Sequence, residues 1–88
     1  MSVKMNLHPF LNDGVELQLE IEGKTVGECL NNVIKRYPAM EKKLFAKKGE
    51  LKGYVEIMVN SKSAYPNELI HPVNNDDVVS VLVFLAGG

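Results

Sequence analysis

The sequence contains a single cysteine, no tryptophan and no long run of apolar residues. One cysteine cannot form an internal disulfide, which excludes a disulfide-rich secreted scaffold. No apolar run approaches the roughly 18 residues needed to cross a membrane. The first residues also lack the apolar core of a signal peptide. We therefore expect a cytoplasmic protein with no membrane partner.

The length and composition are those of one small folded domain. The chain has 88 residues, of which 45% are hydrophobic, and its charges nearly balance at a net of −1. Domains average roughly 150 residues, so there is no room for a second one. A disordered chain would have fewer apolar residues and a larger net charge. We expect residues 1–88 to form a single domain.

The charges are unevenly distributed along the chain. Residues 35–52 hold seven of the ten basic residues and only two acidic ones, a net of +5 that leaves −6 for the rest. Such a stretch is either a solvated loop or a docking surface for an acidic partner. The candidates for docking are Lys42, Lys43, Lys47 and Lys48. No nucleic-acid partner is expected, because the net charge of −1 gives the chain as a whole no attraction to nucleic acid.

Hydrophobic periodicity predicts the secondary structure. Residues 3–7 and 15–21 alternate apolar and polar side chains around a short glycine-containing turn, which indicates a β-hairpin. Apolar residues at helical spacing predict a helix over 26–37. A further strand is expected at 55–59 and an apolar one at 78–85.

Two local signals refine this pattern. Thr25 followed three residues later by Glu28 is a capping box, which places the start of the helix. The segment Lys47–Gly53 is expected to be an exposed basic loop, and Leu69 and Ile70 are expected to anchor a coiled segment or a short edge strand.

The final strand is expected at the centre of the sheet. A strand that is apolar on both faces is normally buried on both. Placing it beside the first strand predicts an α+β fold with a mixed sheet of four to five strands and one main helix across one face. Val79, Val81 and Val83 would then face the helix, which leaves Leu82 and Phe84 outward as an apolar patch for a partner. The opposite phase is the alternative.

No residue constellation predicts catalysis by the chain itself. Cys-x-x-Cys, a phosphate-binding glycine loop and a nucleophile elbow are all missing. His8 and His71 have no ligands at metal-binding spacing, so no metal site is expected. Cys29 lies on the apolar stripe of the helix and is interpreted as a core residue. Asp76 and Asp77 are interpreted as an exposed turn. The chain is not expected to be an enzyme.

The sequence ends in two glycines directly after an apolar strand. Residues 86–88 would form a short flexible tail of Ala86, Gly87 and Gly88 that carries a carboxylate. Glycine has no Cβ, so its backbone can approach other groups closely. A narrow channel of an ATP-using enzyme would admit such a tail and activate its carboxylate.

Several short motifs in this order resemble the MoaD/ThiS sulfur-carrier family, whose members have a ubiquitin-like β-grasp fold. The motifs are Gly23-x-Thr25-Val26-Gly27-Glu28, Tyr37-Pro38, Val59-Asn60, Asp77-Val78 and Gly87-Gly88. The segment 51–60 is similar to the longer MoaD-like and CysO-like members. Asn75-Asp76-Asp77 and Phe84-Leu85-Ala86 differ from the turn and tail of many molybdopterin-type members, so the resemblance leaves the pathway open.

The resemblance implies a function for Gly88. An E1-like adenylyltransferase would bind ATP and use it to activate the Gly88 carboxylate. The carrier itself would bind no cofactor. A sulfur donor would convert the adenylate to a thiocarboxylate. A sulfur-accepting synthase subunit would then use it in molybdopterin-type cofactor or cysteine or homocysteine biosynthesis, where the carrier can be counted as the small subunit of the synthase.

Two other functions remain open at this point. The chain could be a ubiquitin-like modifier joined to other proteins through Gly88. It could also be a non-covalent binding module that uses the sheet face or the lysines.

Overall fold

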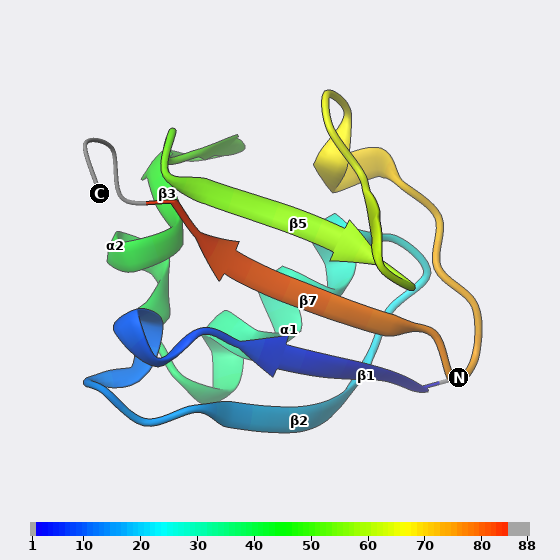
Figure 1. Cartoon of the computed structure of the whole chain (residues 1–88), viewed down its shortest axis with the longest axis horizontal. Helices are drawn as coiled ribbons and strands as arrows, with labels where there is room; N and C mark the ends of the chain where they lie inside the picture. The colour runs from blue at the N-terminus through cyan, green and yellow to red at the C-terminus, as the bar shows by residue number, and fades with distance from the viewer. Residues whose placement is uncertain (1, 85–88) are drawn as a thin grey trace.

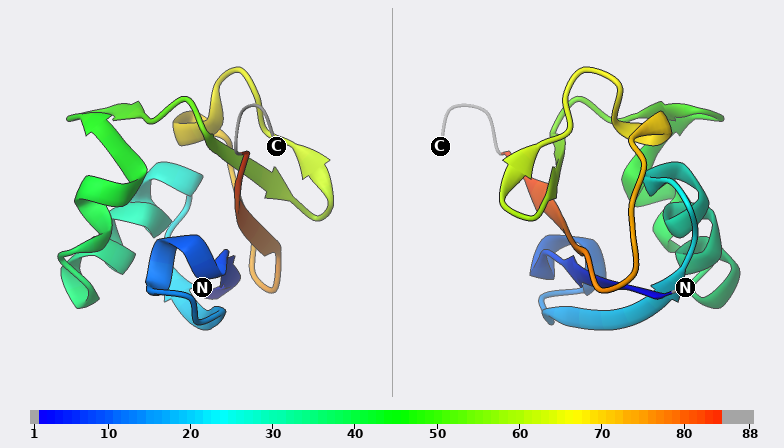
Figure 2. Two further views of the ribbon diagram at one scale, coloured as in Figure 1. Left: turned by 60° about the vertical axis from the view of Figure 1, so that its left-hand side comes forward. Right: turned by 90° about the vertical axis from the view of Figure 1, so that its right-hand side faces the viewer.

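The computed structural model describes residues 2–84 as two layers, a mixed sheet and a layer of helices (Figure 1). Figure 2 shows the sheet on one side and the helices on the other. The elements are β1 (Ser2–Leu7), the 3-10 turn η1 (Pro9–Asn12), β2 (Leu17–Glu22), α1 (Val26–Arg36), α2 (Met40–Leu44), β3 (Phe45–Lys47), β4 (Glu50–Leu51), β5 (Val55–Val59), β6 (Lys62–Ser63), the 3-10 turn η2 (Glu68–Ile70) and β7 (Val78–Val83).

The main sheet has five strands in the order β2-β1-β7-β5-β6. β1 and β7 pair in parallel, whereas β1 with β2 and β5 with β7 pair antiparallel. The prediction of a mixed sheet with the last strand beside the first is confirmed. β7 is hydrogen-bonded on both sides, which suits its apolar sequence.

Helix α1 begins where the sequence predicts. The Glu28 N–H donates to the Thr25 hydroxyl at 3.2 Å, and the Glu28 carboxylate accepts from the Lys24 N–H at 2.9 Å. The two bonds together satisfy backbone donors at the helix start. The helix ends at Arg36, because Pro38 disfavours helical geometry at the preceding residue.

The core lies between α1 and the inner face of the sheet. Its fully buried side chains come from alternate strand positions and from one stripe of the helix. They include Val3, Met5, Leu7, Ile21, Val26, Cys29, Leu30, Val33, Ile57, Val79 and Val81. The interpretation of Cys29 as a core residue is confirmed. Burial, and secondarily the charge of Glu28, raises the pKa of its thiol.

The connection between β1 and β2 differs from the predicted short turn. Pro9 starts the 3-10 turn η1, and the Asp13 backbone adopts a left-handed conformation after it. β2 therefore begins only at Leu17, and Val15 is 60% exposed instead of being part of the strand. The alternation of Val15 with Leu17 was misleading because the chain is still leaving the turn there.

Three further segments refine the predicted pattern. Lys47–Gly53 was expected to be a loop, but β3 and β4 pair there as a small separate hairpin. The segment around Leu69 forms the 3-10 turn η2 rather than an edge strand. β7 ends at Val83, two residues before the predicted end. No helix within residues 2–84 is long and apolar enough to span a membrane.

Candidate partner face and C-terminal strand

The end of β7 is held from both sides by backbone hydrogen bonds. The His8 N–H donates to the Val81 carbonyl at 3.0 Å, and the Phe84 N–H donates to the Tyr54 carbonyl at 2.6 Å. The chain is therefore anchored up to Phe84. Ala86, Gly87 and Gly88, the predicted tail, lie outside the described residues.

The side chains of β7 alternate between the two faces in the predicted phase. Val79 and Val81 are completely buried towards the helix, and Phe84 is 63% exposed. Leu82 is half-buried rather than fully exposed, because it is flanked by its ladder partner Glu56 on β5. Phe84 is thus the main apolar side chain offered to solvent at this end.

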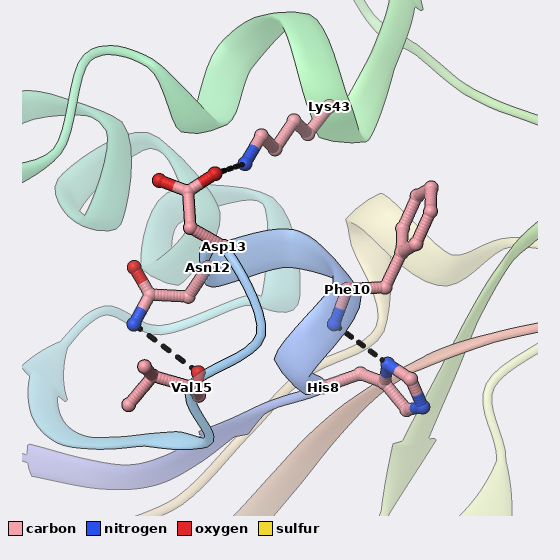
Figure 3. Close-up of polar contacts among 6 residues, drawn as sticks. All are labelled: His8, Phe10, Asn12, Asp13, Val15 and Lys43. Atoms are coloured by element: carbon pink, nitrogen blue, oxygen red, sulfur yellow. Dashed lines mark hydrogen bonds and ion pairs between the residues drawn. The ribbon is translucent and has the colours of Figure 1, made fainter.

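Polar groups surround this end of the outer face. A hollow of about 300 Å³ is lined by Asn6, His8, Glu16, Ser80 and Leu82, among others. The His8 Nδ1 accepts a hydrogen bond from the Phe10 N–H at 3.0 Å, which fixes the orientation of the ring (Figure 3). The hollow combines the apolar side chain of Leu82 with these polar groups, a mixture that suits a surface that binds another protein.

Tyr54 supports the end of β7, a role that the alternating pattern of β5 did not reveal. Its hydroxyl donates to the Lys43 carbonyl at 2.7 Å, which ties the start of β5 to α2. The Phe10 ring packs edge-on against the Tyr54 ring with centroids 5.8 Å apart. Because the Tyr54 carbonyl holds the Phe84 N–H, these contacts help to position the exposed Phe84 ring.

The four candidate lysines do not share one surface. Lys43 turns away and pairs with Asp13 in the β1–β2 connection, with Nζ 3.0 Å from Oδ1 (Figure 3). Lys42, Lys47 and Lys48 line a groove in the helix layer. This groove is on the other side of the molecule from the outer sheet face with Leu82 and Phe84. Partner binding by any of these residues stays a prediction.

The remaining polar candidates are structural. The His71 ring Nδ1 lies 2.9 Å from the Pro72 carbonyl, and His71 also precedes the bridge between Thr25 and Pro72. Within residues 2–84, no group of three or more His, Cys, Asp or Glu side chains is arranged to hold a metal ion.

Asn60 and Asp77 form a clamp between the end of β5 and the start of β7. The Asn60 amide donates to the Asp77 carboxylate at 2.9 Å, and the Asn60 side-chain oxygen accepts from the Val78 N–H at 2.9 Å. The other Asp77 oxygen accepts from the Asn74 N–H at 2.7 Å. The Val59-Asn60 and Asp77-Val78 motifs therefore have a structural role: they set the start of the central strand.

The clamp predicts a pH dependence of stability. The hydrogen bond from Asn60, and then that from the Asn74 backbone, lower the pKa of Asp77 below its ordinary value of 3.8. A lowered folded-state pKa stabilises the protein above the unfolded-state value, and this contribution is lost as pH falls through the folded-state pKa. We expect Asp77→Asn to be less stable than wild type at pH 7 in guanidinium unfolding. The difference should shrink when both proteins are measured below the ordinary pKa.

A second variant removes the Asn60 side chain of the clamp and leaves the backbone conformation unstrained. Asn60 has a positive φ of 51°, which glycine tolerates. Asn60→Gly removes both side-chain bonds, so it should destabilise at pH 7 by about 1–2 kcal/mol. A gap between wild type and Asp77→Asn that stays constant with pH would contradict the assigned role of the Asp77 charge.

Comparison with known proteins identifies the family. The model of the ThiS family matches residues 7–88. The chain belongs to the ThiS family. The match to this family of sulfur carriers spans the capped helix, the clamp and β7.

Solved structures share the whole fold, which is the ubiquitin-like β-grasp. The CysO complex with BexX of Amycolatopsis orientalis matches with TM-score 0.80 and 23% identity, covering 98% of this chain and 99% of that one. Small archaeal modifier protein 1 of Methanosarcina acetivorans matches with TM-score 0.75 and 25% identity, at 99% and 96% coverage.

A third similar structure also contains two different proteins. It is the complex of subunits 1 and 2 of the molybdopterin-converting factor from Helicobacter pylori, with TM-score 0.65, 19% identity and full coverage of both chains. The comparison with curated proteins gave no match.

Proposed function

We propose that the chain is a sulfur carrier that acts through the carboxylate of Gly88. The observation that carries the proposal is the match of residues 7–88 to the ThiS family. The fold supports it, because β7 is anchored up to Phe84 and leads directly into residues 85–88. A partner that binds the outer sheet face would therefore receive the tail from a fixed starting point.

The proposed chemistry has two steps at the Gly88 acyl carbon. A carboxylate oxygen attacks the α-phosphorus of ATP in the active site of an E1-like adenylyltransferase, and pyrophosphate leaves. A sulfur nucleophile at the oxidation level of sulfide then attacks the acyl carbon, and AMP leaves with the electrons of the broken C–O bond. The product is a thiocarboxylate, and neither step changes the oxidation state of carbon or sulfur.

The sulfur is then transferred by a second partner, a sulfur-accepting synthase subunit. Two classes of product fit the family resemblance: a molybdopterin-type cofactor, and cysteine or homocysteine. In either case no side chain of the carrier takes part in the reaction. The surface of the carrier is what the partner proteins recognise.

The proposal is tested by following the conversion of the purified chain. The protein is incubated with ATP, sulfide and an extract of its native host, and the thiocarboxylate is trapped by alkylation of its sulfur and detected by mass. Formation that requires both ATP and sulfide supports the carrier role. A plain carboxylate in the complete mixture would contradict it.

The outer sheet face is expected to determine recognition by the activating enzyme. Phe84→Glu places a charge where an exposed aromatic ring contacts the partner, and losing such an anchor costs at least about 2 kcal/mol. We expect kcat/KM for activation to fall by roughly 30-fold. Ile70→Glu is the matched control, since Ile70 is 72% exposed but lies on η2. Equal effects of the two substitutions would contradict the role of this face.

A ubiquitin-like modifier is a second candidate, favoured by the similarity to small archaeal modifier protein 1 at 25% identity. Both functions share the adenylation step and differ in the nucleophile that attacks the adenylate. In a sulfur carrier the nucleophile is a sulfur donor, whereas in a modifier it is a lysine amine of another protein. Affinity isolation of the tagged chain from its host would show covalent conjugates, with the Gly88 carboxyl joined to lysine in their peptide spectra. A carrier that is not a modifier yields only the unconjugated chain.

A further inference from the structure

The helix layer contains a groove that the carrier mechanism does not use. It has a volume of about 730 Å³ and lies between α1, α2, the β3–β4 hairpin and η2. Its apolar side chains are Ile34, Phe45 and Leu69, which pack partly against the core and remain partly accessible. The floor is therefore a fixed apolar strip rather than a set of mobile side chains.

Basic side chains border this floor. Lys42, Lys47 and Lys48 line the groove, and Glu41 is the acidic residue among its lining. Lys47 also pairs with Glu50, with Nζ 3.3 Å from Oε2. The pair is well exposed, so water screens it and it leaves the basic character of the groove largely intact. An apolar floor with a basic border is complementary to a ligand that is apolar on one side and acidic beside it.

We propose that this groove binds an acidic amphipathic segment of a partner protein. Apolar side chains of the segment would cover Ile34, Phe45 and Leu69, while its carboxylates would lie beside the lysines. The groove is lined by residues of α1 and α2, and these helices lie on the other side of the sheet from its outer face (Figure 2). It can therefore be occupied while another protein covers the outer face near Phe84. The inference is independent of the thiocarboxylate chemistry, because no groove residue takes part in the proposed reaction.

Other occupants fit the groove less well. One acidic strand that a second copy could offer is β2, whose outward side chains are Gln18, Glu20 and Glu22. That strand offers carboxylates but no outward apolar side chain among them for the floor. Nucleic acid has the opposite problem, because the aromatic ring in the groove, Phe45, is partly buried and is not part of an exposed stacking platform.

The test uses a synthetic helical peptide of about 14 residues, or roughly four turns. It carries leucine and phenylalanine on one stripe and glutamate on both flanks. The peptide is titrated into the isotopically labelled full chain, and backbone amide shifts are followed by NMR. We expect the largest shifts at Ile34, Phe45, Lys48 and Leu69, and weaker binding at higher salt. A peptide with lysine in place of glutamate should not bind.

One position allows two variants of opposite charge to be compared. Ala46 is exposed and lines the groove, so Ala46→Glu and Ala46→Lys change the charge with minimal effect on the core. We expect Ala46→Glu to weaken peptide binding about tenfold, which corresponds to about 1.4 kcal/mol. Ala46→Lys should bind at least as tightly as wild type. Ala39→Glu is the remote control, since Ala39 is exposed at the start of α2 and outside the groove.

Three results would overturn the proposal. The first is no binding at millimolar peptide, and the second is shifts centred on the outer sheet face. The third is an equal loss of binding in Ala39→Glu and Ala46→Glu, which would indicate a general charge effect. The proposed sulfur transfer can fail without affecting any of these readouts, so the two proposals are tested separately.

Discussion

Deletion of Gly88 is expected to reduce thiocarboxylate formation to the background seen without the protein. The deletion moves the carboxylate back by one residue, a distance of roughly 3.5 Å, and a narrow activating channel would no longer place it against the α-phosphate of ATP. The five-stranded sheet and the core form within residues 2–84. The free energy of unfolding should therefore change by less than about 0.5 kcal/mol.

A lengthened chain is the control for this deletion. Adding one glycine after Gly88 keeps every native residue and moves the carboxylate forward by a similar distance of roughly 3.5 Å. We expect this variant to lose most of its activity as well, since the position of the carboxylate is what the enzyme requires. Both variants are measured by ATP-dependent conversion and by thermal unfolding. An unchanged rate in the deletion variant would refute the role of Gly88.

Gly27→Ala is expected to destabilise the fold although alanine favours helices. A Cβ at Gly27 would lie 2.8 Å from the Leu69 carbonyl oxygen, which is closer than real Cβ contacts allow. The backbone after η2 cannot retreat freely, because the Val26 N–H donates to the His71 carbonyl at 3.0 Å. Relieving the contact should cost about 1–3 kcal/mol, against a helix-propensity gain of up to about 1 kcal/mol.

With a cost near the middle of its range and the full propensity gain, the expected net loss for Gly27→Ala is about 1 kcal/mol, or a lowering of Tm by roughly 4–8 °C for a domain of this size. Gly53→Ala is the matched control, since a Cβ there meets no atom within 4 Å. We expect its Tm to remain within a few degrees of wild type. Thermal unfolding followed by circular dichroism measures both. A Gly27→Ala variant as stable as Gly53→Ala would contradict the close approach of η2 to α1.

Much of the fold was predictable because each element has its own local signal. The capping box of Thr25 and Glu28 marks the start of α1, and Pro38 explains its end. The apolar run of β7 predicts a central strand, and Ser80 favours the correct phase by placing a hydroxyl on the outer face. Periodicity failed at Val15, where the φ/ψ values of the turn rather than side-chain alternation decide which side chain is buried.

The arrangement of the candidate site was less predictable, because it depends on contacts between distant residues. Lys42 and Lys43 are neighbours in sequence, yet their side chains lie on different surfaces. Lys43 pairs with Asp13, which is 30 residues away along the chain. The role of Tyr54 likewise depends on its hydroxyl reaching the Lys43 carbonyl. The clamp of Asn60 and Asp77 joins two short motifs that the sequence shows only as separate segments. No local pattern specifies such pairings.

The most direct test of the account is the intact mass of the protein isolated from its native host without thiols or alkylating agents. The account predicts a fraction that is heavier by the difference between one sulfur and one oxygen, with fragment ions that place the change at Gly88. Oxidation of one of the four methionines adds a similar nominal mass, so localisation and accurate mass decide between them. A chain that carries only the plain Gly88 carboxylate, even after incubation with ATP, sulfide and host extract, would contradict the carrier role.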